Sequence, residues 1–269
     1  MSQHLITPSK ITAWLECPHY LTLDSQVAAG ILTRPYSVTG SYAELLRDKG
    51  NDHEKACLAA IKAQNKRVKE IPTKAESETF AAFVQRAGNP FNDDDWDFLY
   101  QMPLIHDGMR GTADFIERVV DPETGTVSFE PIDSKLTRTS AKPGHVLQLC
   151  FYADGIEALT GIVPERMHIW LGSGHQESLR VAEFRPYWRR LRQRLARELE
   201  AGPTANTEPV PCSHCQFCEF NPDCEKQWRD ERSTFLVARI RTAEKSALTA
   251  SSVCTIDALA DTEPPVEGV

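Results

Sequence analysis

The sequence lacks any run of about 18 consecutive apolar residues, the length that a membrane-spanning helix needs. Its first residues, Met-Ser-Gln-His-Leu-Ile, also lack the charged and then apolar pattern of a secretory signal. The 269 residues include 41% hydrophobic and 25% charged residues, enough for one large globular domain or two small ones. We therefore expect a cytoplasmic protein with no membrane partner.

The sequence also lacks an excess of positive charge. Lys and Arg number 30 against 38 Asp and Glu, which gives a formal net charge of -8 and does not favour nucleic acid as a partner. A local positive path stays open, because an acidic site for divalent cations lowers the net charge and the basic residues are unevenly spread. Five arginines gather in a predicted helix from Tyr187 to Glu200: Arg189, Arg190, Arg192, Arg194 and Arg197.

Eight cysteines in a chain without an export signal favour metal or cluster ligation over disulfides for those that lie close together. Four of them follow a Pro-rich linker over residues 202–211: Cys212, Cys215, Cys218 and Cys224. By spacing alone, a local four-cysteine zinc site and an iron-sulfur cluster are equally compatible with this run.

The chemistry is concentrated in one predicted strand, Phe129 to Leu136. Side chains alternate along a strand, so Asp133 and Lys135 share one face while Ser134 points to the other. Taken alone, the pair is compatible with a structural cross-strand ion pair as well as with an active site.

The neighbouring segments favour an active site. Asp114 lies in a β-prone stretch after the turn Asp107-Gly108, which predicts a hairpin from about Met102 to Leu136. A helix from Val146 to Leu159 follows and places Gln148 and Tyr152 on one face.

The other segments predict mostly helices. A long helix from about Tyr42 to Lys69 is expected to bury a stripe that includes Leu45, Leu46 and His53, where His53 is either a core histidine or a ligand. Further helices are expected at 10–16, 78–87, 187–200 and 225–240, with two short ones in 242–260, strands at 165–171 and 178–184, and a disordered tail from Asp261.

These residues resemble the PD-(D/E)xK nucleases of the RecB type, including the CRISPR-associated exonuclease branch and the RecB-like nucleases with cysteine clusters. The resemblance runs from about Ile6 to Ile240 and is carried by four motifs: Gly50-Asn-Asp-His53-Glu54, Gly111-Thr-Ala-Asp114, Asp133-Ser-Lys135 and Gln148-Leu-Cys-Phe-Tyr152. Many relatives have Glu where this chain has Asp133, and the family pattern admits either.

The resemblance implies an α/β fold with a restriction-endonuclease-like core, in which helices flank a central mixed sheet. It also implies a metal-dependent DNA nuclease, an exonuclease on single-stranded ends. The implied catalytic residues are Asp114, Asp133, Lys135, Gln148 and Tyr152, with Tyr152 contacting the DNA strand. The implied ligands of Mg²⁺ or Mn²⁺ are His53, Asp114, Asp133 and the carbonyl of Ser134.

In the resembled nucleases, a Cys-x2-Cys-x5-Cys run joins one distant cysteine around a 4Fe-4S cluster. Here Cys215, Cys218 and Cys224 match the run and Cys17 matches the distant partner, while Cys212 is an alternative fourth ligand. The N- and C-terminal segments would then form one iron-sulfur-bearing helical lobe.

The expected division is 1–40 for the N-terminal helical segment, 41–202 for the nuclease core, 203–240 for the cysteine lobe and 241–269 for a helical hairpin with the tail. Expected partners are single-stranded DNA and helicase or recombination proteins, in DNA repair or recombination. The alternative is a non-catalytic iron-sulfur or zinc module that binds DNA ends in a helicase-nuclease or DNA-integration complex.

Overall fold

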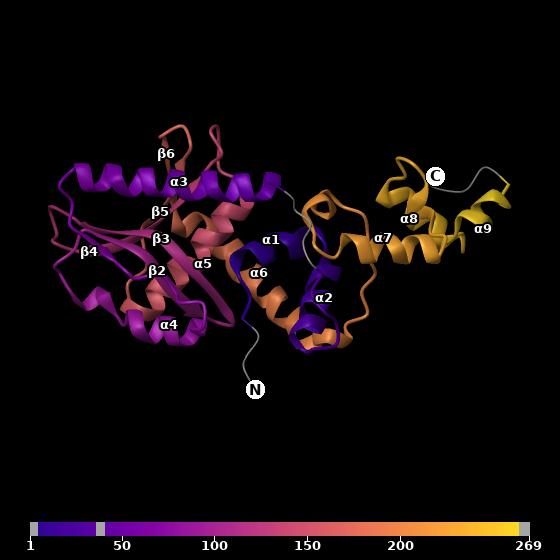
Figure 1. Ribbon diagram of the computed structural model, residues 1–269, viewed down its shortest axis with the longest axis horizontal. Helices are drawn as coiled ribbons and strands as arrows, with labels where there is room; N and C mark the ends of the chain where they lie inside the picture. Colours follow the sequence, from indigo (N-terminus) through magenta and orange to yellow (C-terminus); the bar gives the residue numbers. More distant parts are fainter. Residues whose placement is uncertain (1–4, 36–40, 264–269) are drawn as a thin grey trace. The chain divides into compact units, whose positions relative to one another are not determined.

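A six-stranded mixed sheet, ordered β1-β2-β3-β4-β5-β6, forms the centre of the computed structural model (Figure 1). The β1–β2 and β4–β5 pairs are parallel, and the other three pairs are antiparallel. The strands are β1 (Val68–Glu70), β2 (Phe98–His106), β3 (Met109–Val120), β4 (Val127–Lys135), β5 (Arg166–Leu171) and β6 (Gln176–Arg180). The expected mixed sheet flanked by helices is confirmed.

The structure describes residues 5–35 and 41–263, and the chain divides into two compact units. The first unit comprises Met1–Thr12 and Thr39–Arg197, and the second comprises Ala13–Val38 and Glu198–Val269. The end of the tail expected to be disordered, residues 264–269, lies outside the described residues. In the described ranges, no helix is long and apolar enough to cross a membrane.

The turn between β2 and β3 has the chemistry that the sequence predicts. Asp107 and Gly108 have φ values of 52° and 76°, and a tight two-residue hairpin turn needs positive φ at both positions. The range predicted as one hairpin, Met102 to Leu136, contains most of a three-stranded antiparallel arrangement, because β2, β3 and β4 pair in succession.

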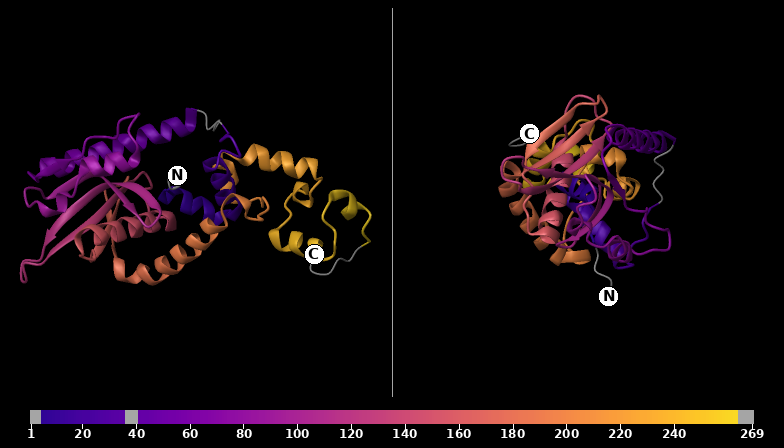
Figure 2. Two further views of the ribbon diagram at one scale, coloured as in Figure 1. Left: turned by 90° about the horizontal axis from the view of Figure 1, so that it is seen from below. Right: turned by 90° about the vertical axis from the view of Figure 1, so that its left-hand side faces the viewer.

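Two helices cover opposite faces of the sheet, α3 (Ser41–Ala63) on one side and α5 (Pro143–Thr160) on the other (Figure 1, Figure 2). Helix α3 packs Cys57 and Ile61 against a cluster formed by Phe98, Phe115 and Ile132. Helix α5 approaches β2 and β3 closely, because Gly155 faces Leu104 and Gly111 leaves room for Tyr152.

The long helix expected at 42–69 ends earlier than predicted. It stops at Ala63, Asn65 takes a left-handed φ of 57°, and the following residues form β1 beside β2. Leu45 and Leu46 are 51% and 43% exposed, so this part of the predicted buried stripe is wrong. Apolar side chains are buried only where another element covers them, and no described element of the first unit covers these two.

The remaining predicted helices are present with shifted ends, whereas α2 and the 3-10 helices were not predicted. These elements are α1 (Pro8–Glu16), α2 (Pro18–Ala28), α4 (Phe80–Ala87), α6 (Val181–Ala201), α7 (Asn221–Asp230), α8 (Thr242–Ala250), α9 (Ile256–Ala260) and the short 3-10 helices η1 (Pro90–Asn92), η2 (Gly202–Thr204), η3 (Ser213–Phe217) and η4 (Thr234–Leu236). The strand expected at 178–184 ends at Arg180, where α6 begins. The helix expected at 225–240 ends at Asp230, and the left-handed Arg232 follows it.

The second unit joins the two ends of the chain in one core. Ala13 and Tyr20 from the N-terminal segment pack with Phe220 from the C-terminal segment, and Cys17 and Cys218 border this cluster. Burial of apolar surface from both segments therefore holds them together without any metal.

Two glycine substitutions test the packing of the first unit. An added Cβ at Gly172 would lie 2.6 Å from the backbone oxygen of Leu136, whereas at Gly50 in α3 it would meet nothing within 4 Å. We expect Gly172→Ala to lower the free energy of unfolding by about 1–3 kcal/mol through overpacking. We expect Gly50→Ala to raise it by up to about 1 kcal/mol, because alanine favours helix. Chemical denaturation measures both, and changes of the same sign would contradict the packing described here.

Candidate active site

Asp133 and Lys135 lie on one face of β4 and contact each other at the end of the strand. Asp133 is 0% exposed, and Lys135 Nζ lies 2.5 Å from its Oδ2. This ion pair meets the charge of the buried oxygen, and among the described residues no other group donates to it. A buried carboxylate oxygen that is compensated by a single ammonium is also a natural ligand for a metal cation.

Asp114 on β3 is held by the strand beside it. Its Oδ2 accepts hydrogen bonds from the backbone N–H of Ser134 at 2.8 Å and from the Ser134 hydroxyl at 2.7 Å. The expectation that the Ser134 side chain points away from the site is wrong, because the hydroxyl turns to satisfy this carboxylate. The backbone carbonyl, which is the proposed ligand atom of Ser134, is a different group.

Helix α5 presents Gln148 and Tyr152 to the same region. Gln148 Nε2 donates to Asp133 Oδ1 at 2.9 Å and to the Tyr152 hydroxyl at 2.8 Å, and that hydroxyl donates to the carbonyl of Thr112 at 2.7 Å. Tyr152 is 2% exposed, so the expected contact between its side chain and a DNA strand is not supported. Both residues instead fix the carboxylate of Asp133 relative to β3.

Burial controls the charge state of the pair. It raises the pKa of Asp133 to about 7; the Lys135 charge opposes this rise and the negative charge of Asp114 adds to it. Burial by itself disfavours the Lys135 ammonium, but the charges of Asp133 and Asp114 outweigh it and raise the pKa of Lys135 above its usual value. Lys135 is therefore a cation at neutral pH when no metal is present.

Helix α3 places His53 against β5. Its Nε2 lies 3.2 Å from the carbonyl oxygen of Trp170, an acceptor, so this nitrogen is the one that donates, and Trp170 pairs with Ser134 of β4. A metal-ligating histidine usually donates its other N–H to a carbonyl or carboxylate in this way.

Glu54 is a site residue that the sequence reasoning missed. Burial raises its pKa, and the nearby charge of Asp114 raises it further while Lys135 lowers it. One turn along α3, burial followed by the charges of Asp114 and Glu54 raises the pKa of Cys57 to about 11. These electrostatic interactions place Glu54 and Cys57 on α3 near Asp114. The sequence signal that could have identified Glu54 as a site residue is its position next to His53.

A model of the PD-(D/E)XK nuclease superfamily matches residues 30–225. The chain belongs to this superfamily. No protein of curated function matches it. A solved structure from Eubacterium rectale, described as a "Putative exonuclease", matches at a TM-score of 0.44 and 15% identity over 88% of this chain and 94% of that chain. The superfamily model over residues 30–225 shows the family.

The carboxylates of this nuclease fit a hard divalent cation, since Mg²⁺ and Mn²⁺ prefer oxygen ligands. Asp133 Oδ2 is buried against the Lys135 ammonium, and Asp114 and Glu54 add negative charge around it. Across residues 5–35 and 41–263, no three His, Cys, Asp or Glu side chains stand at metal-ligating positions.

The arginines of α6 divide into two groups. Arg192 forms ion pairs with Asp154 and Asp107 within the first unit, so it does not contribute to the local positive path that the sequence left open. The other four arginines are exposed: Arg189, Arg190, Arg194 and Arg197.

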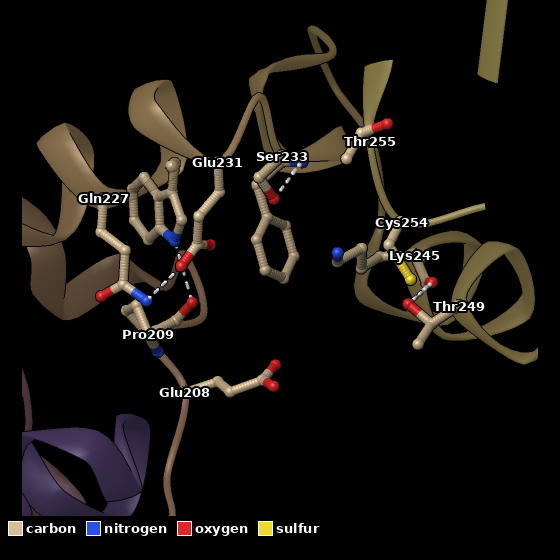
Figure 3. A pocket seen from close by; sticks show the side chains of 11 residues that line it. Glu208, Pro209, Gln227, Glu231, Ser233, Lys245, Thr249, Cys254 and Thr255 are labelled. Atoms are coloured by element: carbon tan, nitrogen blue, oxygen red, sulfur yellow. Dashed lines mark hydrogen bonds between the residues drawn. The ribbon is translucent and has the colours of Figure 1, made fainter. Parts of the chain in front are cut away.

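A pocket of about 220 Å³ lies within the second unit (Figure 3). Trp228 and Phe235 form its apolar walls, and the Lys245 ammonium lies 4.6 Å from the centre of the Phe235 ring. None of the predicted site residues lines this pocket, which therefore is not the nuclease site.

The predicted cluster ligands meet in the second unit. A cavity of about 10 Å³ is lined by all five candidate thiols: Cys17, Cys212, Cys215, Cys218 and Cys224. Burial, followed by the charge of Glu219 and the neighbouring thiols, raises the pKa of Cys218 to about 11. Burial and the neighbouring thiols raise the pKa of Cys224 to about 12. These thiols are protonated at neutral pH, so a metal that binds them must displace protons.

The raised pKa of Asp133 predicts a pH-dependent affinity for metal. Below about pH 7 a cation must displace the proton of Asp133, so the Mn²⁺ affinity should fall about tenfold per pH unit there and level off above. Calorimetric titration without DNA measures this affinity, and Asp133→Asn is the control that should lose both the affinity and its pH dependence. An affinity that is constant between about pH 5 and pH 8 would contradict the assignment.

Proposed function

We propose that this chain is a RecB-like deoxyribonuclease that depends on Mg²⁺ or Mn²⁺ and acts as an exonuclease on single-stranded DNA ends. The observation that carries the proposal is the buried Asp133 carboxylate, whose Oδ2 lies 2.5 Å from the ammonium of the half-buried Lys135 on the same strand face. A structural ion pair needs neither a second carboxylate nor a helix that holds Asp133 through Gln148, and both are present.

His53, Asp114, Asp133 and the carbonyl of Ser134 would hold the cation, which when bound supplies Lewis acidity toward the attacking water and a phosphate oxygen. Lys135, displaced from Asp133 Oδ2, is free to orient the attacking water. As a cation it also offsets the negative charge that develops on the phosphate in the transition state. Gln148 keeps Asp133 in place through its bond to Oδ1.

Single-stranded DNA is favoured by the surface of α6. Arg189 and Arg190 are exposed, and Tyr187 beside them is 58% exposed. Proteins that bind single strands combine positive charge with exposed aromatic rings on which bases stack.

A 4Fe-4S cluster held by Cys17, Cys215, Cys218 and Cys224 is the proposed cofactor of the second unit. Its support is the chemistry of the donors, four thiols around one cavity bordered by apolar side chains. In the described part of the chain no three of these side chains already stand at metal-ligating positions, so cluster assembly would have to rearrange the thiols.

Zinc is the second candidate because of one distance. Cys212 Sγ and Cys215 Sγ lie 3.8 Å apart. A tetrahedral zinc site with Zn–S bonds of about 2.3 Å has an edge of about 3.8 Å between sulfur atoms. This pair favours a local zinc site that includes Cys212.

The proposed setting is cytoplasmic DNA repair or recombination, together with a helicase or recombination protein. We also propose the division into segments 1–40, 41–202, 203–240 and 241–269. A non-catalytic module that binds DNA ends is the alternative, and the intact set of Asp114, Asp133 and Lys135 weighs against it, because a module without activity is free to lose one.

Removing the acid or the lysine tests the proposed reaction. We expect Asp133→Ala and Lys135→Ala each to lower Mn²⁺-dependent cleavage of labelled single-stranded DNA by about 10²-fold or more, with the fold retained. Lys55→Ala, which removes an exposed lysine from α3, is the matched control and should cleave normally. Wild-type rates in either site variant would refute the assignment.

Two cysteine variants distinguish the cofactors. With a 4Fe-4S cluster, Cys17→Ser should lose iron, sulfide and the absorbance near about 400 nm, whereas Cys212→Ser should keep them. Metal analysis of anaerobically purified protein and limited proteolysis provide the readouts. Zinc that is lost in Cys212→Ser and kept in Cys17→Ser would replace the cluster with the local site.

A further inference from the structure

Gln101 has an unusual backbone for its position. Its φ is 61°, in the left-handed region that residues other than glycine rarely adopt. Gln101 nevertheless lies inside strand β2. The other non-glycine residues with positive φ in the described ranges lie in turns or after helix ends: Asn65, Asp107, Arg232, Arg239 and Ser252. Strain inside an element persists only where the surroundings maintain it, and it is frequent at functional sites.

The position of Gln101 in the sheet connects it to the nuclease site. Tyr100 pairs with Phe115 and Met102 pairs with Ala113, so Gln101 stands opposite Asp114 in the register. The ladder between β2 and β3 is interrupted at this step, because no pairing joins the two residues. The strained residue therefore lies directly across from a proposed metal ligand.

The side chain of Gln101 is occupied by Glu54. Its Nε2 donates a hydrogen bond to Glu54 Oε1, and the hydroxyl of Tyr100 hydrogen-bonds the same carboxylate. Adjacent residues in a regular strand point to opposite faces of the sheet. Tyr100 and Gln101 reach one acceptor because the left-handed backbone of Gln101 redirects its side chain.

Glu54 lies close enough to Asp114 and Lys135 for their charges to act on it. Its carboxylate has no lysine or arginine ion pair among the described residues, and two neutral donors hold it in place. We propose that Gln101 is a positioning residue of the nuclease site, which holds the Glu54 carboxylate beside Asp114 as a further oxygen donor for the divalent cation. This inference rests on the proposed metal-dependent function, and it assigns to both residues roles that the four sequence motifs leave open.

The test is Mn²⁺ affinity measured by calorimetry without DNA, in variants that separate the amide from the backbone. Gln101→Gly keeps the left-handed backbone without strain and removes the amide, and we expect it to weaken Mn²⁺ binding about tenfold or more, as is typical for residues that orient metal ligands. Asn65→Gly is the matched control: it relieves the same conformation, φ 57°, in the turn after α3 and should leave the affinity unchanged.

A double-mutant cycle tests whether Gln101 acts through Glu54. Glu54→Gln should weaken binding, and adding Gln101→Gly to it should cause no further loss, because the carboxylate to be positioned is already absent. Circular dichroism checks the fold. If Gln101→Gly does not fold, Gln101→Asn replaces it, since asparagine tolerates positive φ but its amide is one methylene shorter.

The outcomes separate this inference from the proposed function. Wild-type affinity in Gln101→Gly, or losses that add fully in the double variant, would overturn the role of Gln101 even if cleavage falls. If the variants follow the expected cycle in Mn²⁺ affinity but the wild-type protein cleaves no DNA, the role of Gln101 stands and the nuclease proposal is overturned. A wild-type protein that binds no Mn²⁺ would overturn both.

Discussion

The burial of the Asp133 carboxylate is the constraint on which the active site depends. A fully buried carboxylate is costly unless other groups compensate for its charge, and here Lys135 and Gln148 do so in part. The second oxygen lies against Lys135, and Asp114 adds a second negative charge nearby. Two carboxylates therefore share one lysine, and a bound divalent cation would compensate the remaining negative charge.

The same carboxylate connects the site to the packing of α5 against the sheet. Gln148 binds both Asp133 and Tyr152, and the tyrosine hydroxyl binds the backbone of β3. Gly111 makes this approach possible, because a Cβ there would lie 3.0 Å from the rings of Phe151 and Tyr152. Changes at this helix-sheet contact would therefore alter the position of Asp133 as well as stability.

The second unit is held together by apolar packing between its two chain segments. Apolar packing of Tyr20 with Phe220 already brings the N-terminal and C-terminal segments together. Cys17 and the C-terminal thiols line one cavity next to this core. Binding of a metal or cluster there would add its free energy to an association that hydrophobic burial has already established.

The sequence by itself determined the features that depend on local spacing. Strand alternation placed Asp133 with Lys135, the helical repeat placed Gln148 with Tyr152, and the Asp107-Gly108 pair predicted the turn. These motifs carried the resemblance to the nuclease superfamily, and that resemblance in turn implied the mixed sheet.

Only the tertiary structure decided which distant groups meet. Leu45 is exposed because no described element of its unit covers it, and Arg192 is paired because Asp154 and Asp107 come within reach. Glu54 joins the site because α3 packs across the sheet, and Gln101 takes a left-handed backbone to reach it. Such contacts join residues tens of positions apart. The periodicity that predicts strands and helices depends only on local spacing, so it cannot predict these contacts.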